Sequence, residues 1–330
     1  MTLAGLLLAA AAVAAAAPVE TALLDAAFEA PKTAFTARKL VTAWYGEQSR
    51  AVAQTVYFNP PNQWRHEVLD AGGNITRVTL QVGAKEWVLE AAADRIIERD
   101  VRDLHGGSVA RETLRELLAQ NFSVARLHPK TIAGRPAEGL LFSPVSNEGP
   151  RKTIWIDRET GIVLRRRQTN HRGKQIRESS ITALTLNPEF DKALFDPAAL
   201  KGGPPIPAPE RPILESADAL VEAGFPKSFW VPELDYGFRL DAVRRLPMRS
   251  EQLLHARYVN GLSVLSLFVS PLPIDPHSIP TVESDDEEID FTASAWAGNV
   301  LSFACGNKRH CVIIGDLSAK ALTKLSRRFP

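Results

Sequence analysis

Residues 152–197 constrain the fold of this chain more than any other stretch. Strand-like runs lie at residues 153–156, 162–167 and 175–186, and the turns between them carry Gly161 and Gly173. Runs rich in β-branched and aromatic residues, separated by short glycine-bearing turns, predict an antiparallel meander. Because such a sheet must cover one face, the preceding chain is expected to supply more strands and the helices that pack on them.

The chain before the meander has the same strand-and-turn pattern. Strands are predicted at residues 34–46, 51–58, 63–68, 75–82, 85–89, 123–127 and 137–142. One helix is predicted over residues 20–29, and a second begins at Ser108 as N-cap and carries Leu114, Leu117 and Leu118. Five successive strands without an intervening helix favour an antiparallel open barrel or sandwich over an α/β enzyme core.

The first residues have the pattern of an export signal. Residues 3–17 form an unbroken run rich in leucine and alanine, short for a membrane span and followed by Pro18. No lysine or arginine precedes the run, and an uncleaved anchor or a buried helix are the alternatives. We expect residues 1–17 to be a signal peptide and the protein to be exported.

A proline-rich stretch divides the chain. Residues 201–212 contain five prolines and are expected to form neither a helix nor a strand ladder, so they are interpreted as an extended linker. The predicted domains are therefore residues 18–200 and 213–330. In the second domain we expect a helix at 217–223, strands at 238–243, 253–259 and 262–269, a two-residue hairpin turn at Asn260-Gly261, and a last helix capped by Ser318.

The two cysteines, Cys305 and Cys311, flank a short turn between two strand-like runs. We expect them to face each other at the end of a hairpin and, in an oxidising compartment, to form a disulfide. A metal site that includes His310 is the alternative, but two further ligands are not evident.

Two groups of residues are candidates for binding. The aromatic residues on or beside predicted strands are candidates to line an apolar cavity: Trp44, Tyr57, Trp64, Trp87, Phe122 and Trp155. An ordinary sheet core explains them equally well. The basic residues Arg165, Arg166, Arg167, Arg172 and Lys174 are candidates to attract an acidic partner or lipid headgroups, with a solvated surface as the alternative.

Enzyme and cofactor motifs are not found in the sequence. The stretch His105-Gly-Gly-Ser108 resembles a lipase oxyanion loop, but no Gly-x-Ser-x-Gly nucleophile motif accompanies it. His66-Glu67 lacks the second histidine of a zinc protease, and the acidic run at 283–288 lacks the spacing of a calcium loop. The net charge of +1 offers no general affinity for nucleic acid. We expect no enzyme activity, no metal and no cofactor.

Several motifs resemble one known family. The stretches VTAWYG at 41–46, YFNPPNQWRHE at 57–67, IWIDRETGIVL at 154–164 and ALFDP at 193–197 resemble the N-terminal domain of periplasmic sigma-E regulatory proteins of the RseB/MucB type. YGFRL at 236–240, YVNGLSVLSLF at 258–268 and VIIGD at 312–316 resemble that family's second domain. One departure is Asn260, where an acidic residue is expected.

The resemblance implies a fold of the α+β class that is mostly antiparallel β. It implies an N-terminal unclosed barrel of the LolA/LolB type, wrapped on helices, with an apolar cavity for acyl chains or apolar peptide. The smaller C-terminal α/β domain would contact a membrane-anchored anti-sigma factor like RseA, with Asn260 as one partner-facing candidate. We therefore expect a periplasmic regulator that senses lipid or mislocalised lipoprotein; a lipid or lipoprotein carrier without a signalling partner is the alternative. A second copy of the chain is a further candidate partner, which would make a homodimer.

Overall fold

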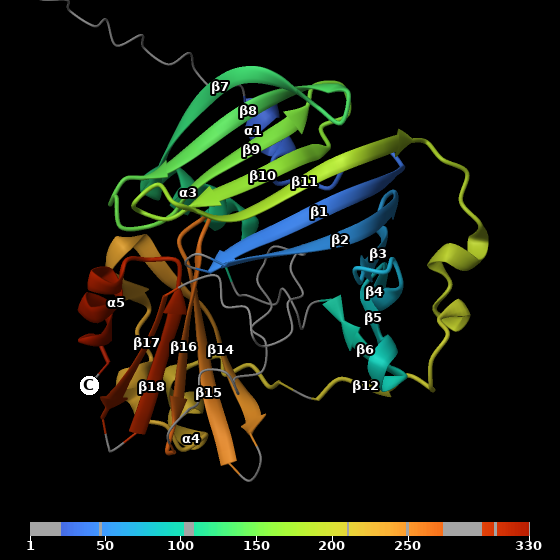
Figure 1. The fold of residues 1–330 in the computed structure, drawn as a ribbon. Helices are drawn as coiled ribbons and strands as arrows, with labels where there is room; N and C mark the ends of the chain where they lie inside the picture. Colours follow the sequence, from blue (N-terminus) through green and yellow to red (C-terminus); the bar gives the residue numbers. More distant parts are fainter. Residues whose placement is uncertain are drawn as a thin grey trace, which may run out of the picture.

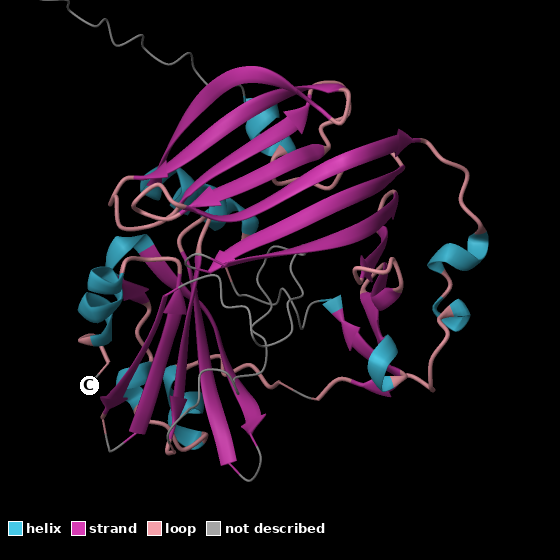
Figure 2. Ribbon diagram, in the orientation of Figure 1, coloured by secondary structure: helices cyan, strands magenta, loops and turns pink. Residues whose placement is uncertain are grey.

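The computed structural model describes residues 21–45, 48–101, 109–209, 211–248, 251–272, 299–306 and 309–329. The predicted signal peptide, the His105–Ser108 stretch and the acidic run at 283–288 lie outside these residues. The chain forms two sheets, of twelve and six strands, and short helices pack against them (Figures 1 and 2). No helix within the described ranges is long and apolar enough to cross a membrane.

The first sheet contains the predicted meander. Its strands are β1 (Phe35–Tyr45), β2 (Gln48–Asn59), β3 (Gln63–Leu69), β4 (Ile75–Val82), β5 (Lys85–Glu90), β6 (Arg95–Asp100), β7 (Phe122–Ile132), β8 (Arg135–Pro144), β9 (Arg151–Asp157), β10 (Val163–Thr169), β11 (Gln175–Leu186) and β12 (Ile206–Pro207). In space they run β12-β6-β5-β4-β3-β2-β1-β11-β10-β9-β8-β7. Because β7 and β12 lie at opposite edges, the curved sheet does not close, and the predicted open barrel is confirmed.

Two helices fill the curve of this sheet. In Figure 1, β7 to β11 arch over α1 (Thr21–Ala26) and α3 (Arg111–Asn121). Ala27, which follows α1, and Leu118 of α3 pack with Phe142 and Ile154 of the sheet in one buried cluster. The leucine spacing that predicted the second helix is therefore the spacing of its buried side.

A second apolar cluster lies at the β4 to β6 end of the first sheet. Phe195 and Leu200, from the segment after β11, pack with Leu80, Leu89 and Ile96. This segment contains two 3₁₀ turns, Lys192–Phe195 and Pro197–Ala199. The carboxylate of Asp191 accepts a hydrogen bond from the Ala193 amide, and that of Asp196 accepts one from the Ala198 amide. The chain therefore covers this part of the sheet before it reaches the linker.

The second sheet is antiparallel and has one helix-covered face. Its strands are β13 (Glu233–Leu234), β14 (Phe238–Met248), β15 (Glu251–Val259), β16 (Val264–Ser270), β17 (Asn299–Cys305) and β18 (Arg309–Gly315), in the order β13-β14-β15-β16-β18-β17. Leu220 of α4 (Ala217–Glu222) and Leu322 and Leu325 of α5 (Ala319–Ser326) belong to its main core. The hydroxyl of Ser318 accepts from the Ala321 amide at 3.1 Å, which confirms the predicted cap.

Three local predictions were wrong, and one strand was missed. Ala110, not Ser108, is the N-cap of α3. The β15–β16 turn has four residues, 260–263, because Val259 pairs with Val264. Strand β6 was not predicted. The linker does form a ladder, since Ile206 and Pro207 pair in parallel with β6; an edge strand tolerates proline because only one side needs hydrogen bonds.

Candidate functional site

The two sheets meet at the end of helix α3, where Asn121 joins them. Its Nδ2 donates to the carbonyl oxygens of Asn260, at 3.2 Å, and Gly237, at 3.4 Å. Both acceptors belong to turns of the second sheet. A single amide on the first unit is thus bonded to two separate turns of the other unit.

Two glycines permit this close approach. Gly261 has a φ of +100°, and a Cβ there would overlap the backbone nitrogen of Leu118 in α3. Gly237 has a φ of +72°, and a Cβ there would overlap the side chain of Asn121. Both positions therefore need glycine for conformation and for space.

Three further contacts extend the junction across the two sheets. Lys152 Nζ of β9 donates to the carbonyl oxygen of Leu262 at 2.6 Å. Gln168 Nε2 of β10 donates to Asp316 Oδ2 at 2.6 Å. The Ser318 amide donates to the Glu148 carbonyl at 2.9 Å. Together with the two bonds of Asn121, three of these five bonds have a backbone carbonyl of the second unit as acceptor, so they depend on the placement of its turns.

A cavity of about 180 Å³, which we call the junction pocket, lies at this contact. Phe122, Pro144 and Val145 line it from the first unit, and Tyr236, Ser263 and Leu317 line it from the second. Tyr236 has a φ of 66°, and burial raises the pKa of its phenol, so it is neutral. The pocket exists only while the two units are in contact.

The structure distributes the candidate cavity aromatics over separate clusters. Trp64 and Trp155 belong to one cluster, Tyr57 and Trp87 to the cluster beneath the 190–200 segment, and Phe122 to the cluster on α3. Trp44 is half-buried on β1. Tyr57 and Trp87 both bond carboxylates: Tyr57 to Glu67 at 3.3 Å and Trp87 to Glu98 at 3.1 Å. These residues do not converge on one site, and of the six only Phe122 lines the junction pocket.

The basic run on β10 is largely ion-paired. Arg165 and Arg167 donate to Glu178 on β11, at 2.9 and 2.8 Å. Burial opposes ionisation of Glu178, but the two guanidinium groups outweigh it and lower the pKa of the carboxyl. Both arginines also lie within 5.9 Å of the Trp155 ring centre. The Glu178 carboxylate thus neutralises part of their positive charge, so less of that charge is available to attract an acidic partner.

The other candidates for partner contact differ in exposure. Arg172 and Lys174 are exposed in the β10–β11 turn, where Asn170 Oδ1 accepts from both of their backbone amides at 3.0 Å. Asn260 is buried at the junction, and its Oδ1 accepts from the Ser263 amide at 3.0 Å. The Asn260 side chain therefore shapes the turn that meets α3.

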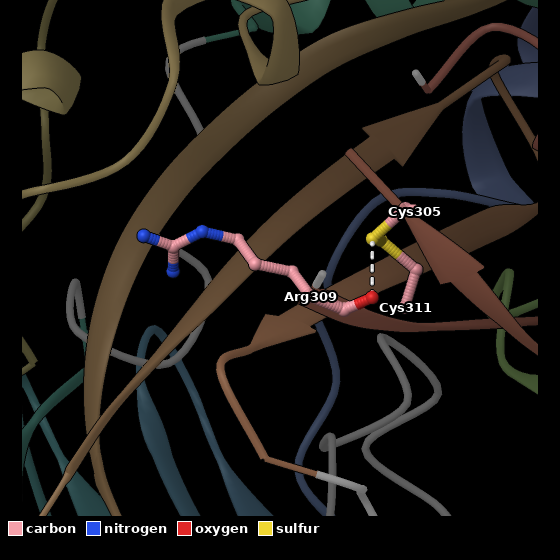
Figure 3. The surroundings of a disulfide bond; sticks show 3 residues. All are labelled: Cys305, Arg309 and Cys311. Carbon is pink, nitrogen blue, oxygen red and sulfur yellow. Dashed lines mark hydrogen bonds between the residues drawn. A yellow bond between two sulfur atoms is a disulfide. The ribbon is translucent and has the colours of Figure 1, made fainter. Parts of the chain in front are cut away.

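The cysteines form the expected disulfide. Cys305 and Cys311 are bonded, with their Cα atoms 5.9 Å apart (Figure 3). They lie diagonally, because Cys305 is opposite Arg309 and Cys311 is opposite Phe303. The predicted disulfide at the end of the hairpin is confirmed, and the two cysteines are offset by two residues in register. Among the described residues, no group of His, Cys, Asp and Glu is arranged to hold a metal.

Sequence reasoning missed most of the junction. Asn121, Lys152 and Gln168 appear in the sequence as ordinary polar residues of a helix end and two strands. The Asn260-Gly261 pair was visible as a turn, but nothing in the sequence indicated that α3 packs against it. The local signal that the sequence offered was the glycine after Asn260, which predicts a turn.

Comparison with known proteins agrees with this architecture. Residues 77–199 match the family model described as the MucB/RseB N-terminal domain. The complex of Pseudomonas aeruginosa MucA and MucB contains a chain with 16% identity and a TM-score of 0.57, covering 92% of this chain and 96% of that one. MucB in complex with MucA(peri) has 16% identity and a TM-score of 0.57, with 93% of this chain and 96% of that one covered. MucB alone has 14% identity and a TM-score of 0.54, with the same coverage of 93% and 96%. No curated protein sequence matches significantly.

The fold and junction define a class of two-unit proteins, in which an open antiparallel barrel on helices is joined to a smaller sheet with helices. Within that class, the predicted resemblance to the RseB/MucB type is confirmed by the match over residues 77–199 and by the likeness in fold to MucB across both units.

Proposed function

We propose that this chain is a periplasmic regulatory protein that binds the periplasmic segment of a membrane-anchored anti-sigma factor. The observation that carries the proposal is the MucB/RseB match over residues 77–199, together with a likeness to MucB that extends over both sheets. The solved relatives include MucB bound to the periplasmic part of MucA, so the same kind of partner is proposed here. Binding, not catalysis, is the proposed activity.

The proposed organisation has a signal peptide at residues 1–17, a sensing domain at 18–200, a linker at 201–212 and a partner-binding domain at 213–330. A lipid or a mislocalised lipoprotein would bind to the apolar inner side of the open barrel, where α1 and α3 pack in this structure. Its binding would favour one arrangement of the two domains and thereby change the affinity for the anti-sigma factor. The hydrogen bonds of Asn121 support this mechanism, because such directional bonds form in one arrangement of the two domains and are lost in another.

The proposal is tested by titrating the chain with the periplasmic segment of the anti-sigma factor from the same organism, by calorimetry. We expect saturable binding that weakens when the protein is first loaded with a lipid from its own periplasm. Native mass spectrometry of protein purified from that compartment identifies such a lipid. An anti-sigma segment that does not bind would contradict the regulatory role.

The alternative function is a lipid or lipoprotein carrier. The second sheet, with its own core, favours a regulator, since a carrier needs only the open barrel. Transfer of an acylated protein between membrane vesicles, without any binding to the anti-sigma segment, would support the carrier instead.

A further inference from the structure

The junction pocket contains a polar group without a partner. Ser263 is 5% exposed and lines the pocket, and its Oγ has no hydrogen-bond partner in the part of the chain that the structure describes. A hydroxyl can donate one hydrogen bond and accept two, and a buried one without a partner is unfavourable. The Ser263 hydroxyl therefore marks the place where a bound polar group would be favoured.

The size of the pocket limits what can bind. About 180 Å³ is smaller than the roughly 300–1,000 Å³ of pockets that hold drug-sized ligands. An extended acyl chain or a nucleotide does not fit. One amino-acid side chain does fit. Because the lining residue Val145 is exposed, the pocket reaches the surface there, and the backbone of a bound peptide can stay outside it.

The chemistry of the walls limits the ligand further. Phe122, Pro144 and Leu317 are apolar and buried, and among the lining residues only Tyr236 carries a titratable group, which burial keeps neutral. A charged side chain would lose its hydration here, and the charged groups that act on the Tyr236 phenol, Lys324, Glu148 and Asp235, are of both signs, so a ligand charge of either sign gains little. The walls suit an apolar stem, and Ser263 suits a polar, uncharged end.

We propose that the junction pocket binds one neutral side chain with a hydrogen-bonding end, of the glutamine type, from an extended peptide. Because both units contribute walls, an occupied pocket also stabilises their present arrangement. This inference goes beyond the proposed function and does not depend on it, since any peptide with such a residue would serve.

The probes are three blocked amino acids: N-acetylglutamine methylamide, its charged isostere N-acetylglutamate methylamide, and the apolar N-acetylnorleucine methylamide. Each is titrated into the full isotope-labelled chain, and backbone amide shifts are followed by NMR. We expect the glutamine derivative to shift Ser263 and Asn260 in a saturable way. The glutamate derivative should bind about tenfold or more weakly, which corresponds to the loss of one well-made interaction.

Variants separate the pocket from general effects. Ser263→Ala should weaken the glutamine derivative about fivefold and leave the norleucine derivative unchanged, because one net hydrogen bond is lost. Val145→Trp, at the pocket wall, should abolish both. Val221→Trp is the matched control, since Val221 is exposed on α4 and does not line the pocket.

Three results would overturn the inference: no saturable shift, equal affinity for glutamine and glutamate derivatives, or an equal loss in the Val221→Trp control. Ordered water on Ser263 that the glutamine derivative does not displace would overturn it as well. The test uses no anti-sigma segment, so a pocket that binds glutamine in a chain that ignores the anti-sigma factor would refute only the proposed function.

Discussion

His255 is a single residue whose burial makes stability depend on pH. It is 7% exposed in β15, its ring stacks on Phe268 with centres 4.6 Å apart, and its Nε2 lies 3.1 Å from Ser266 Oγ. Burial, aided by Arg244 and Arg211, lowers the pKa of His255 to about 3. In the unfolded chain the ordinary value is about 6.5, so unfolding takes up a proton between these two values.

We predict that His255→Gln reduces the sensitivity of the protein to acid. A lowered histidine pKa contributes stability above about pH 6.5 that is lost as the pH falls toward 3, at up to about 1.4 kcal/mol per pH unit. Urea unfolding at pH 7.0, 5.5 and 4.5 should give a shallower loss for the variant than for the wild type. Parallel losses would show that His255 does not remain neutral in the fold.

Gly261 supports a second prediction at the same scale. Gly261→Ala should destabilise the protein by about 2 kcal/mol more than Gly173→Ala, because the added methyl meets Leu118 of α3 as well as an unfavourable φ. Gly173 has a similar φ of +78° but nothing within 4 Å of its Cβ position, so it controls for the backbone cost. Thermal unfolding measures both variants, and equal losses would mean that the turn does not press on the helix.

Among the elements, the β17–β18 hairpin depends on its disulfide. Closing so short a loop restricts the unfolded chain by about 2 kcal/mol on a chain-entropy estimate. We predict that reduction with a phosphine lowers the free energy of unfolding by that amount. The double variant Cys305→Ala/Cys311→Ala is the control, since its stability should not respond to the reductant. A wild type that is equally indifferent would mean that the disulfide is dispensable.

The elements also show how far sequence reasoning reaches. The meander was predictable because Gly161 and Gly173 adopt the positive φ that its turns need, at +73° and +78°. Strand β6 was not predictable, because its charged residues hide the alternation of polar and apolar positions that marks a strand. Arg99 of β6 donates to Glu86 Oε1 of β5 at 2.6 Å, and this pairing between strands cannot be seen in the local sequence. Of the candidate site, the turn at Gly261 was visible, but its contact with α3 depends on residues about 140 positions away.

At the scale of the whole molecule, each unit has its own apolar core, and the junction combines hydrogen bonds with the packing of Leu262 against the cluster on α3. We predict that Asn121→Ala/Lys152→Met removes the three junction bonds of these side chains and separates thermal unfolding into two calorimetric transitions. Asn121→Ala/Lys192→Met is the control for the added apolar surface, because Lys192 is exposed on the 3₁₀ turn far from the junction in sequence and takes no part in it. Failure of the first variant to unfold in two steps would indicate another source of cooperativity.

The short strand β12 limits how far the two units can separate. The Ala208 amide donates to the Glu98 carbonyl at 2.8 Å, and Ile213 forms a bridge with Arg244 of β14. Only residues 209–212 lie between these two anchors, and five steps of extended chain reach about 18 Å at most. While both anchors hold, the second unit stays within this distance of the first even when the junction opens. The junction can then form again quickly, because the short linker keeps the effective concentration of one unit near the other high.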